Sequence, residues 1–358
     1  LIMTANSGLT LSNSTLTSTG NISLQGGTSL SLASGMNISG ANITLGGSSI
    51  TANGTDNLNS GTGSTTISGA LSTNNKALSI TASDLILTGS INTGTNATTL
   101  SVTNSGALGL GFTSGFSGMN LSNSELALIT GDLNLINGNI TAATGTSLNL
   151  TGKLVIGASG GSITGQGSMT LAATNGLVID SSINSSGNLA LDGDSNNSSQ
   201  TSDGIALASG VSLTSSGGTI TLDATNGGVT VPGAATLTAA GVLNLNDNFT
   251  ASGPILIKSN GLTIGGTTLS SGTASTTILT SIAGTTIGLC GAVCSGSFGL
   301  ELTSTNLNKI SAGSFILGDS TNGNITVEGI TTSIGDVTLN ATNSVSYTHL
   351  TLPTSDLV

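Results

Sequence analysis

The chain has 358 residues, of which 36% are hydrophobic, only 2% aromatic and 5% charged, with no Trp. Fifteen acidic residues against four basic ones give a formal net charge of −11. All four basic residues are lysines, so no basic stripe is available to neutralise phosphates, and we expect neither a nucleic-acid partner nor an anionic membrane surface.

A repeated pattern of aliphatic residues begins near the start of the chain. Its first two passes are Leu9-Thr-Leu11, Leu16 and Ile22-Ser-Leu24, followed by Leu30-Ser-Leu32, Ile38 and Ile43-Thr-Leu45. The passes are about 21 residues apart, a period typical of solenoids. Within each pass, aliphatic residues alternate with Ser, Thr or Asn, which is the periodicity of strands. We therefore predict an all-β, right-handed parallel β-helix (β-solenoid) with three short strands per coil of about 20 to 23 residues.

The pattern is clearest in the middle of the chain. There Leu133, Ile140 and Leu148 are matched one coil later by Leu154, Ile163 and Met169. The many Asn residues form Asn-x-Ser/Thr triplets by chance in such a composition. We predict that they line adjacent coils as hydrogen-bonded ladders.

Two stretches interrupt the pattern before the middle of the chain. Residues 56–75 are rich in Gly, Ser and Asn, which predicts a loop that protrudes from the coil. Residues 106–119 contain Phe112 and Phe116. We expect these rings to stack inside the bore or to cap a corner, with a surface binding patch as the alternative.

The segment at 192–204 is the clearest insertion, because all its residues are polar or Gly. Its carboxylates Asp192, Asp194 and Asp203 make it a candidate contact loop, since insertions on solenoids gather function. Clustered carboxylates could also hold calcium. The calcium-binding nonapeptide is not repeated here, so a solvated loop is the favoured interpretation and no metal site is predicted.

Cys290 and Cys294 are the sharpest local feature. Three residues separate them, and the small Gly291 and Ala292 permit a tight loop. A structural disulfide at a corner is the favoured interpretation, with two unpaired buried thiols second. Two cysteines are too few for a tetrahedral zinc site.

Residues 1–345 are expected to form a single β-helical repeat domain within a longer chain whose export signal lies upstream. Residues 346–358 depart in composition and contain the only Tyr and the only His, Tyr347 and His349. The run YTHLTLPT resembles translated sequencing-adapter read-through. We therefore interpret 346–358 as a non-native tail and assign it no role.

No catalytic constellation is apparent. Glycan-cleaving β-helices need clustered carboxylates, or calcium with a basic residue. The nearest approaches here are Asp180 with Asp192 and Asp319 with Glu328, so we predict no catalytic residue and no cofactor. A carbohydrate-active enzyme remains the alternative. An ice-binding solenoid ranks last, because triplets such as Thr15-Leu-Thr17 are scattered without a steady recurrence.

Several stretches resemble a known family. The segments GTITLDATNGGVTV (218–231) and ISAGSFILGDSTNGNITVEGI (310–330) look like coils of filamentous-haemagglutinin-like exoproteins and autotransporter passengers of Gram-negative bacteria. The resemblance implies a β-helical shaft of a surface or secreted adhesin. It also implies an extracellular location, an outer-membrane translocator barrel as partner during export, and an unidentified ligand on a host or neighbouring cell.

Overall fold

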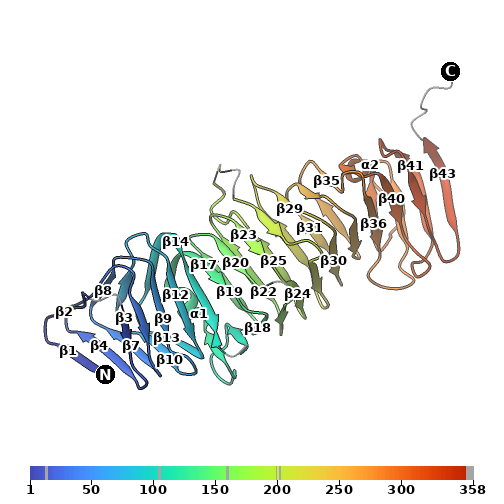
Figure 1. The fold of residues 1–358 in the computed structure, drawn as a ribbon. Coiled ribbons are helices and arrows are strands. Elements are labelled where there is room, and N and C mark those ends of the chain that lie inside the picture. Colours follow the sequence, from blue (N-terminus) through green and yellow to red (C-terminus); the bar gives the residue numbers. More distant parts are fainter. Residues whose placement is uncertain (13–14, 104–105, 159–160, 199, 201–202, 352–358) are drawn as a thin grey trace. The chain divides into compact units, whose positions relative to one another are not determined.

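The computed structural model describes residues 1–12, 15–103, 106–158, 161–198, 200 and 203–351. The chain divides into two compact units, Leu1–Ser181 and Ser182–Val358. Both are built from stacked parallel strands, and the chain forms a β-solenoid of about 16 turns with about 21 residues per turn (Figure 1). The predicted parallel β-solenoid is therefore confirmed.

The first unit stacks its strands into several parallel sheets. One sheet contains β1 (Ile2–Ala5), β4 (Ile22–Gly26), β7 (Ile43–Gly46), β10 (Ser64–Ile67) and β13 (Asp84–Leu87). A second contains β2 (Gly8–Thr10), β3 (Thr15–Thr17), β5 (Ser29–Leu32), β6 (Asn37–Ser39), β8 (Ser49–Ala52), β9 (Asp56–Asn59), β11 (Ala70–Ser72), β12 (Leu78–Ala82), β14 (Ile91–Val102), β17 (Ile129–Leu135), β20 (Leu154–Ile156) and β23 (Leu177–Ile179). The remaining elements are β15 (Leu108–Leu110), β16 (Met119–Leu121), β18 (Asn139–Ala142), β19 (Thr146–Leu150), β21 (Ser162–Gly165), β22 (Met169–Ala173) and the short helix α1 (Asn123–Leu126).

The second unit follows the same plan. One face contains β24 (Ser182–Ser185), β27 (Ser212–Ser215), β30 (Ala235–Ala239), β33 (Ile255–Lys258), β36 (Ser275–Leu279), β40 (Ser314–Leu317) and β42 (Val337–Leu339). The others contain β25 (Leu189–Asp192), β28 (Ile220–Asp223), β31 (Leu243–Leu245) and β34 (Leu262–Ile264), then β26 (Ile205–Leu207), β29 (Val229–Val231), β32 (Phe249–Ala251), β35 (Leu269–Ser270) and β39 (Ile310–Ser311). Last come β37 (Ile287–Cys290), β38 (Leu300–Thr303), β41 (Ile325–Thr331), β43 (Val345–Thr351) and the helix α2 (Ser304–Leu307).

Aliphatic side chains form columns that run through successive coils. Leu9 pairs with Leu30, Leu16 with Ile38, and Ile22 with Ile43, as the repeat predicts. Ile22, Ile43 and their counterparts are almost fully buried, whereas the residues between them face outward. The core of each unit is therefore a narrow column made mainly of Leu, Ile, Val and Ala.

Asparagine ladders reinforce this register from outside the core. The amide of Asn42 donates to Asn21 Oδ1 at 2.9 Å, and the amide of Asn57 donates to Asn37 Oδ1 at 2.8 Å. Each bond joins residues one coil apart, as predicted for the Asn-rich composition. Such contacts favour in-register stacking over slipped pairing.

Residues 56–75 do not protrude, and that prediction is wrong. They form β9, β10 and β11, in register with the neighbouring coils. The inward positions hold polar Ser60 and Thr65, which are buried, and the Thr65 hydroxyl donates to Ser60 Oγ at 3.1 Å. Because these hydroxyls satisfy each other, a coil with few aliphatic residues still closes.

The predicted match of Leu148 with Met169 is displaced by two residues. Leu148 pairs with Leu171, and Met169 pairs with Thr146. Thr146 occupies the inward position because its hydroxyl contacts the carbonyl oxygens of Leu110 and Ala143 at 2.9 and 2.8 Å. A buried Thr therefore begins the strand where only aliphatic residues were expected.

Part of the predicted tail adds a strand to the second unit. β43 pairs with β41, with register shifts around Glu328. Residues 352–358 lie outside the described part of the chain.

The register makes complete coils interchangeable. Deleting residues 22–42 joins Asn21 to Ile43, which takes the place of Ile22, so we expect an intact β-sheet spectrum and one cooperative unfolding transition. Deleting residues 22–32 alone breaks the columns and leaves buried aliphatic side chains unmatched, each worth about 1.5–3 kcal/mol. Circular dichroism and thermal unfolding of both variants test this. Equal stability of the two would contradict the column register.

Candidate functional site

The loop that follows β25 is held together by its own acidic side chains. Asp194 is 1% exposed; one carboxylate oxygen accepts the backbone N–H of Ser198 at 2.8 Å and the other accepts from the Asn226 amide at 3.4 Å. Asp203 is also buried and accepts from the Ser198 hydroxyl at 2.7 Å. Asp192 is half-buried and accepts the N–H of Asp194 at 3.0 Å.

These contacts change the predicted role of the three carboxylates. Asp194 and Asp203 are turned into the fold, so the solvated-loop interpretation is wrong for them. The side chains that this loop exposes are instead the amides of Asn196, Asn197 and Gln200. The most exposed side chains of the described part of the loop are therefore neutral amides.

The same loop begins a stack of acidic residues along one corner of the second unit. Asp192 pairs with Asp223 in the neighbouring strand, and the Asn246 amide donates to Asp223 Oδ2 at 2.9 Å one coil further on. Burial, followed by neighbouring carboxylates, raises the pKa of Asp192 and of Asp247 above the usual range. Among the described residues, no group of three or more His, Cys, Asp or Glu is arranged to hold a metal ion.

Replacing Asp194 by Ala tests the structural role of this loop. The change leaves the Ser198 N–H and the Asn226 amide without their carboxylate partner, so we expect a loss of about 1–3 kcal/mol in the free energy of unfolding. Gln200→Ala, in the same loop at an exposed position, is the matched control and should change stability by less than about 0.5 kcal/mol. Chemical denaturation measures both; an unchanged Asp194→Ala variant would contradict the buried contacts.

The two cysteines are joined in the second unit. Cys290 ends β37 and is fully buried, and it forms a disulfide with Cys294, their Cα atoms 5.0 Å apart. The Glu328 carboxylate accepts from the backbone N–H and the hydroxyl of Ser295 at 2.8 and 2.7 Å, which lowers the pKa of Glu328. The loop tip is Val293, whose side chain is 83% exposed.

Each unit also contains one pair of parallel strands that the repeat did not predict. We call each pair a fold-back, because the chain returns to the same sheet after less than a full coil. Leu108 of β15 pairs with Met119 of β16, and Ile287 of β37 pairs with Leu300 of β38, so two strands much closer in sequence than one coil lie side by side. A one-turn helix with a capping box follows each, namely α1 after Ser122 and α2 after Thr303. The sequence signal for the fold-backs was the similarity between two segments, LSNSELALI (121–129) and LTSTNLNKI (302–310).

An aromatic ring covers a glycine in both fold-backs. A Cβ on Gly109 would lie 2.6 Å from the Phe116 ring, and one on Gly288 would lie 2.4 Å from the Phe298 ring. Phe112 stacks on Phe116 with ring centroids 4.9 Å apart, and both rings are half-buried. The rings therefore pack on the outside of a strand, and the prediction that they stack in the bore is wrong.

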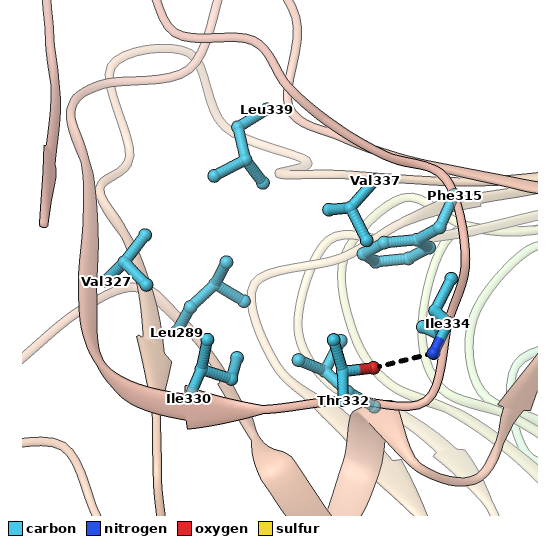
Figure 2. A pocket seen from close by; sticks show the side chains of 9 residues that line it. Leu289, Phe315, Val327, Ile330, Thr332, Ile334, Val337 and Leu339 are labelled. Carbon is cyan, nitrogen blue, oxygen red and sulfur yellow. Dashed lines mark hydrogen bonds between the residues drawn. The ribbon is translucent and has the colours of Figure 1, made fainter. Parts of the chain in front are cut away.

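A cavity of about 90 Å³ lies among the last coils of the second unit (Figure 2). Its walls are aliphatic and aromatic, including Leu289, Phe315 and Val327, with Thr332 as the one polar lining residue. The Thr332 hydroxyl accepts the N–H of Ile334 at 3.1 Å. Its lining therefore contains no acid, base or nucleophile suited to catalysis.

One carboxylate is buried in the core of the first unit. Asp56 is fully buried; Oδ1 accepts the N–H of Met36, whereas Oδ2 has no partner. Burial raises the pKa of Asp56 above 3.8 despite hydrogen bonds from the backbone of Met36 and Gly54. Asp319 is the opposite case, because hydrogen bonds from the Thr321 hydroxyl and nearby backbone lower its pKa.

Asp56→Asn and Asp319→Asn should change the pH dependence of stability in opposite directions. The stabilising contribution of Asp56 is complete below about pH 3.8 and is lost as pH rises through its raised folded pKa, whereas that of Asp319 is complete above 3.8 and is lost as pH falls. Relative to wild type, Asp56→Asn should gain and Asp319→Asn should lose unfolding free energy as pH rises from about 3 to 8. Parallel pH profiles for the two variants would contradict these environments.

The first unit carries a regular polar surface on its second sheet. Five consecutive coils each place two outward side chains there, in two rows. The rows are Thr15, Asn37, Asn57, Ser79 and Thr99, and Thr17, Ser39, Asn59, Thr81 and Ser101. All ten are exposed or half-buried, and we call this surface the hydroxyl–amide face.

The hydroxyl–amide face is not a repeated Thr-x-Thr surface, in agreement with the scattered triplets of the sequence. Among its five coils that triplet occurs only as Thr15-Leu-Thr17, and Asn or Ser occupies one or both positions in the other four. Their spacing also alternates, since Thr15 pairs with Asn37 and Asn37 with Asn57. A search for Thr-x-Thr at a constant period therefore missed the alignment.

Comparison with known proteins found no family model, curated protein or solved structure that matches this chain. Within the described residues, the structure contains no helix with the length and hydrophobicity needed to span a membrane.

Proposed function

We propose that this chain is part of the structural shaft of a bacterial surface or secreted adhesin, a spacer that presents distal regions for attachment. The observation that carries the proposal is the uniformity of the coils: inward positions are aliphatic over most of the array, and outward positions are mainly Ser, Thr and Asn. Such an array gains its stability from coil-to-coil contacts and can lengthen without a new core.

The side-chain chemistry also favours a structural role. The acidic residues Asp56, Asp194 and Asp203 are buried and hydrogen-bonded within single units. The cavity lining offers no ionisable group. A carbohydrate-active enzyme would instead need carboxylates that converge in a groove.

The disulfide bears on location. Small disulfide loops persist in oxidising compartments, which favours an exported protein. With the resemblance of 310–330 to exoprotein coils, this supports an extracellular or cell-surface location and export through an outer-membrane translocator barrel. In this proposal, the distal regions of the parent protein bind the attachment ligand.

Coil deletions in the bacterium that encodes the chain test the spacer role. Residues 22–42 and residues 220–242 are each one coil, since Ile22 pairs with Ile43 and Ile220 with Leu243. A spacer predicts that the two deletions reduce cell attachment equally and slightly, and that purified chain does not compete. Antibody labelling of intact cells checks display of each variant.

Other results would refute the spacer role. If one deletion abolished attachment while the other had no effect, or if purified chain blocked attachment, a receptor-binding site would lie in these residues. Absence of the chain from the cell surface and medium would exclude the exported location.

A further inference from the structure

The hydroxyl–amide face has a spacing set by the solenoid itself. Along each row, side chains are separated by the distance between stacked strands, about 4.8 Å. The two residues of each triplet are separated by two strand positions, roughly 6.6 Å. Because all five coils are in register, the ten side chains form a regular two-dimensional array of two rows.

This array is rigid. Beneath four of its five coils, Ile38, Leu58, Ile80 and Leu100 are at most 1% exposed and fix the strands against the core, whereas Leu16 beneath the first coil is half-buried. The four Thr side chains are β-branched and stiff at χ1. The Asn57 amide donates to Asn37 Oδ1 at 2.8 Å, which orders both side chains. Little conformational entropy would therefore be lost when a ligand binds.

The chemistry of the face excludes several kinds of occupant. None of its ten residues is charged, although the chain carries a net charge of −11, so charge complementarity favours an uncharged partner over nucleic acid, anionic lipid or a mineral surface. It also lacks Trp, Tyr and Arg, the residues that dominate the energetics of protein interfaces. Its area, about 20 Å by 7 Å, is far below the roughly 800 Å² per partner of a stable protein complex.

We propose that the hydroxyl–amide face binds the surface of ice. Ice is an uncharged lattice that presents hydrogen-bond donors and acceptors at regular intervals. A rigid periodic array can engage such a lattice through many weak contacts at once, with little ordering cost. The methyl groups of Thr15, Thr17, Thr81 and Thr99 add apolar contact between the polar groups. This binding does not depend on the adhesin proposal.

Ice recrystallisation inhibition and thermal hysteresis of the purified full chain test the proposal. Thr81→Lys places a long, strongly hydrated charge within the face and should raise the concentration needed for inhibition at least tenfold. Thr66→Lys is the matched control, because Thr66 is also half-buried and outward-facing, in the same coil but on the first sheet. It should retain wild-type activity. Thermal unfolding confirms that both variants are folded.

Several outcomes would overturn the proposal. One is a wild-type chain that performs no better than serum albumin in both assays. Another is an equal loss in Thr66→Lys and Thr81→Lys. Two further results, each with ice activity absent, would assign the face to another partner. Retention on crystalline cellulose or chitin that Thr81→Lys abolishes would indicate a neutral glycan. Dimerisation in ultracentrifugation that Thr81→Lys abolishes would indicate a second copy of the chain.

Discussion

The structure depends on the register between coils. Each coil exposes an apolar side that it cannot bury alone, and only stacking of Ile22 on Ile43, and of Leu9 on Leu30, removes it from water. Because strand side chains alternate, a slip of one residue would turn an entire column outward. The Asn ladders impose the same register from outside the core, so backbone pairing, burial and polar side chains agree.

Irregularities gather at the corners because the strands cannot absorb them. The loop after β25 satisfies its own polar groups through Asp194 and Asp203, and the loop after β37 is closed by a disulfide and bound to Glu328. Each insertion is thus fixed locally, without a change in the columns beside it. The conspicuous acidic residues and cysteines of the sequence therefore serve the fold.

Much of the fold could be predicted because the sequence itself shows the buried columns. Alternate aliphatic residues indicate the strands, and their nearly constant period indicates that the strands stack in successive coils. The errors occur where a polar residue points inward. Thr146, Ser60 and Thr65 fill core positions through hydrogen bonds that only the folded coil reveals. The fold-backs of β16 and β38 were missed for a different reason, since their pairing partners lie closer in sequence than the repeat allows.

The hydroxyl–amide face could not be predicted for a related reason. Its Ser, Thr and Asn residues do not stand out in a chain rich in these residue types. The numbers of residues between successive members of a row also alternate around the mean period. Corners absorb that alternation, so the strands align even though the sequence spacing does not. Since inward and outward positions are independent, an outer face can acquire a binding surface while the buried column, and hence the shaft, stays unchanged. Structural and binding roles can therefore coexist in the same coils.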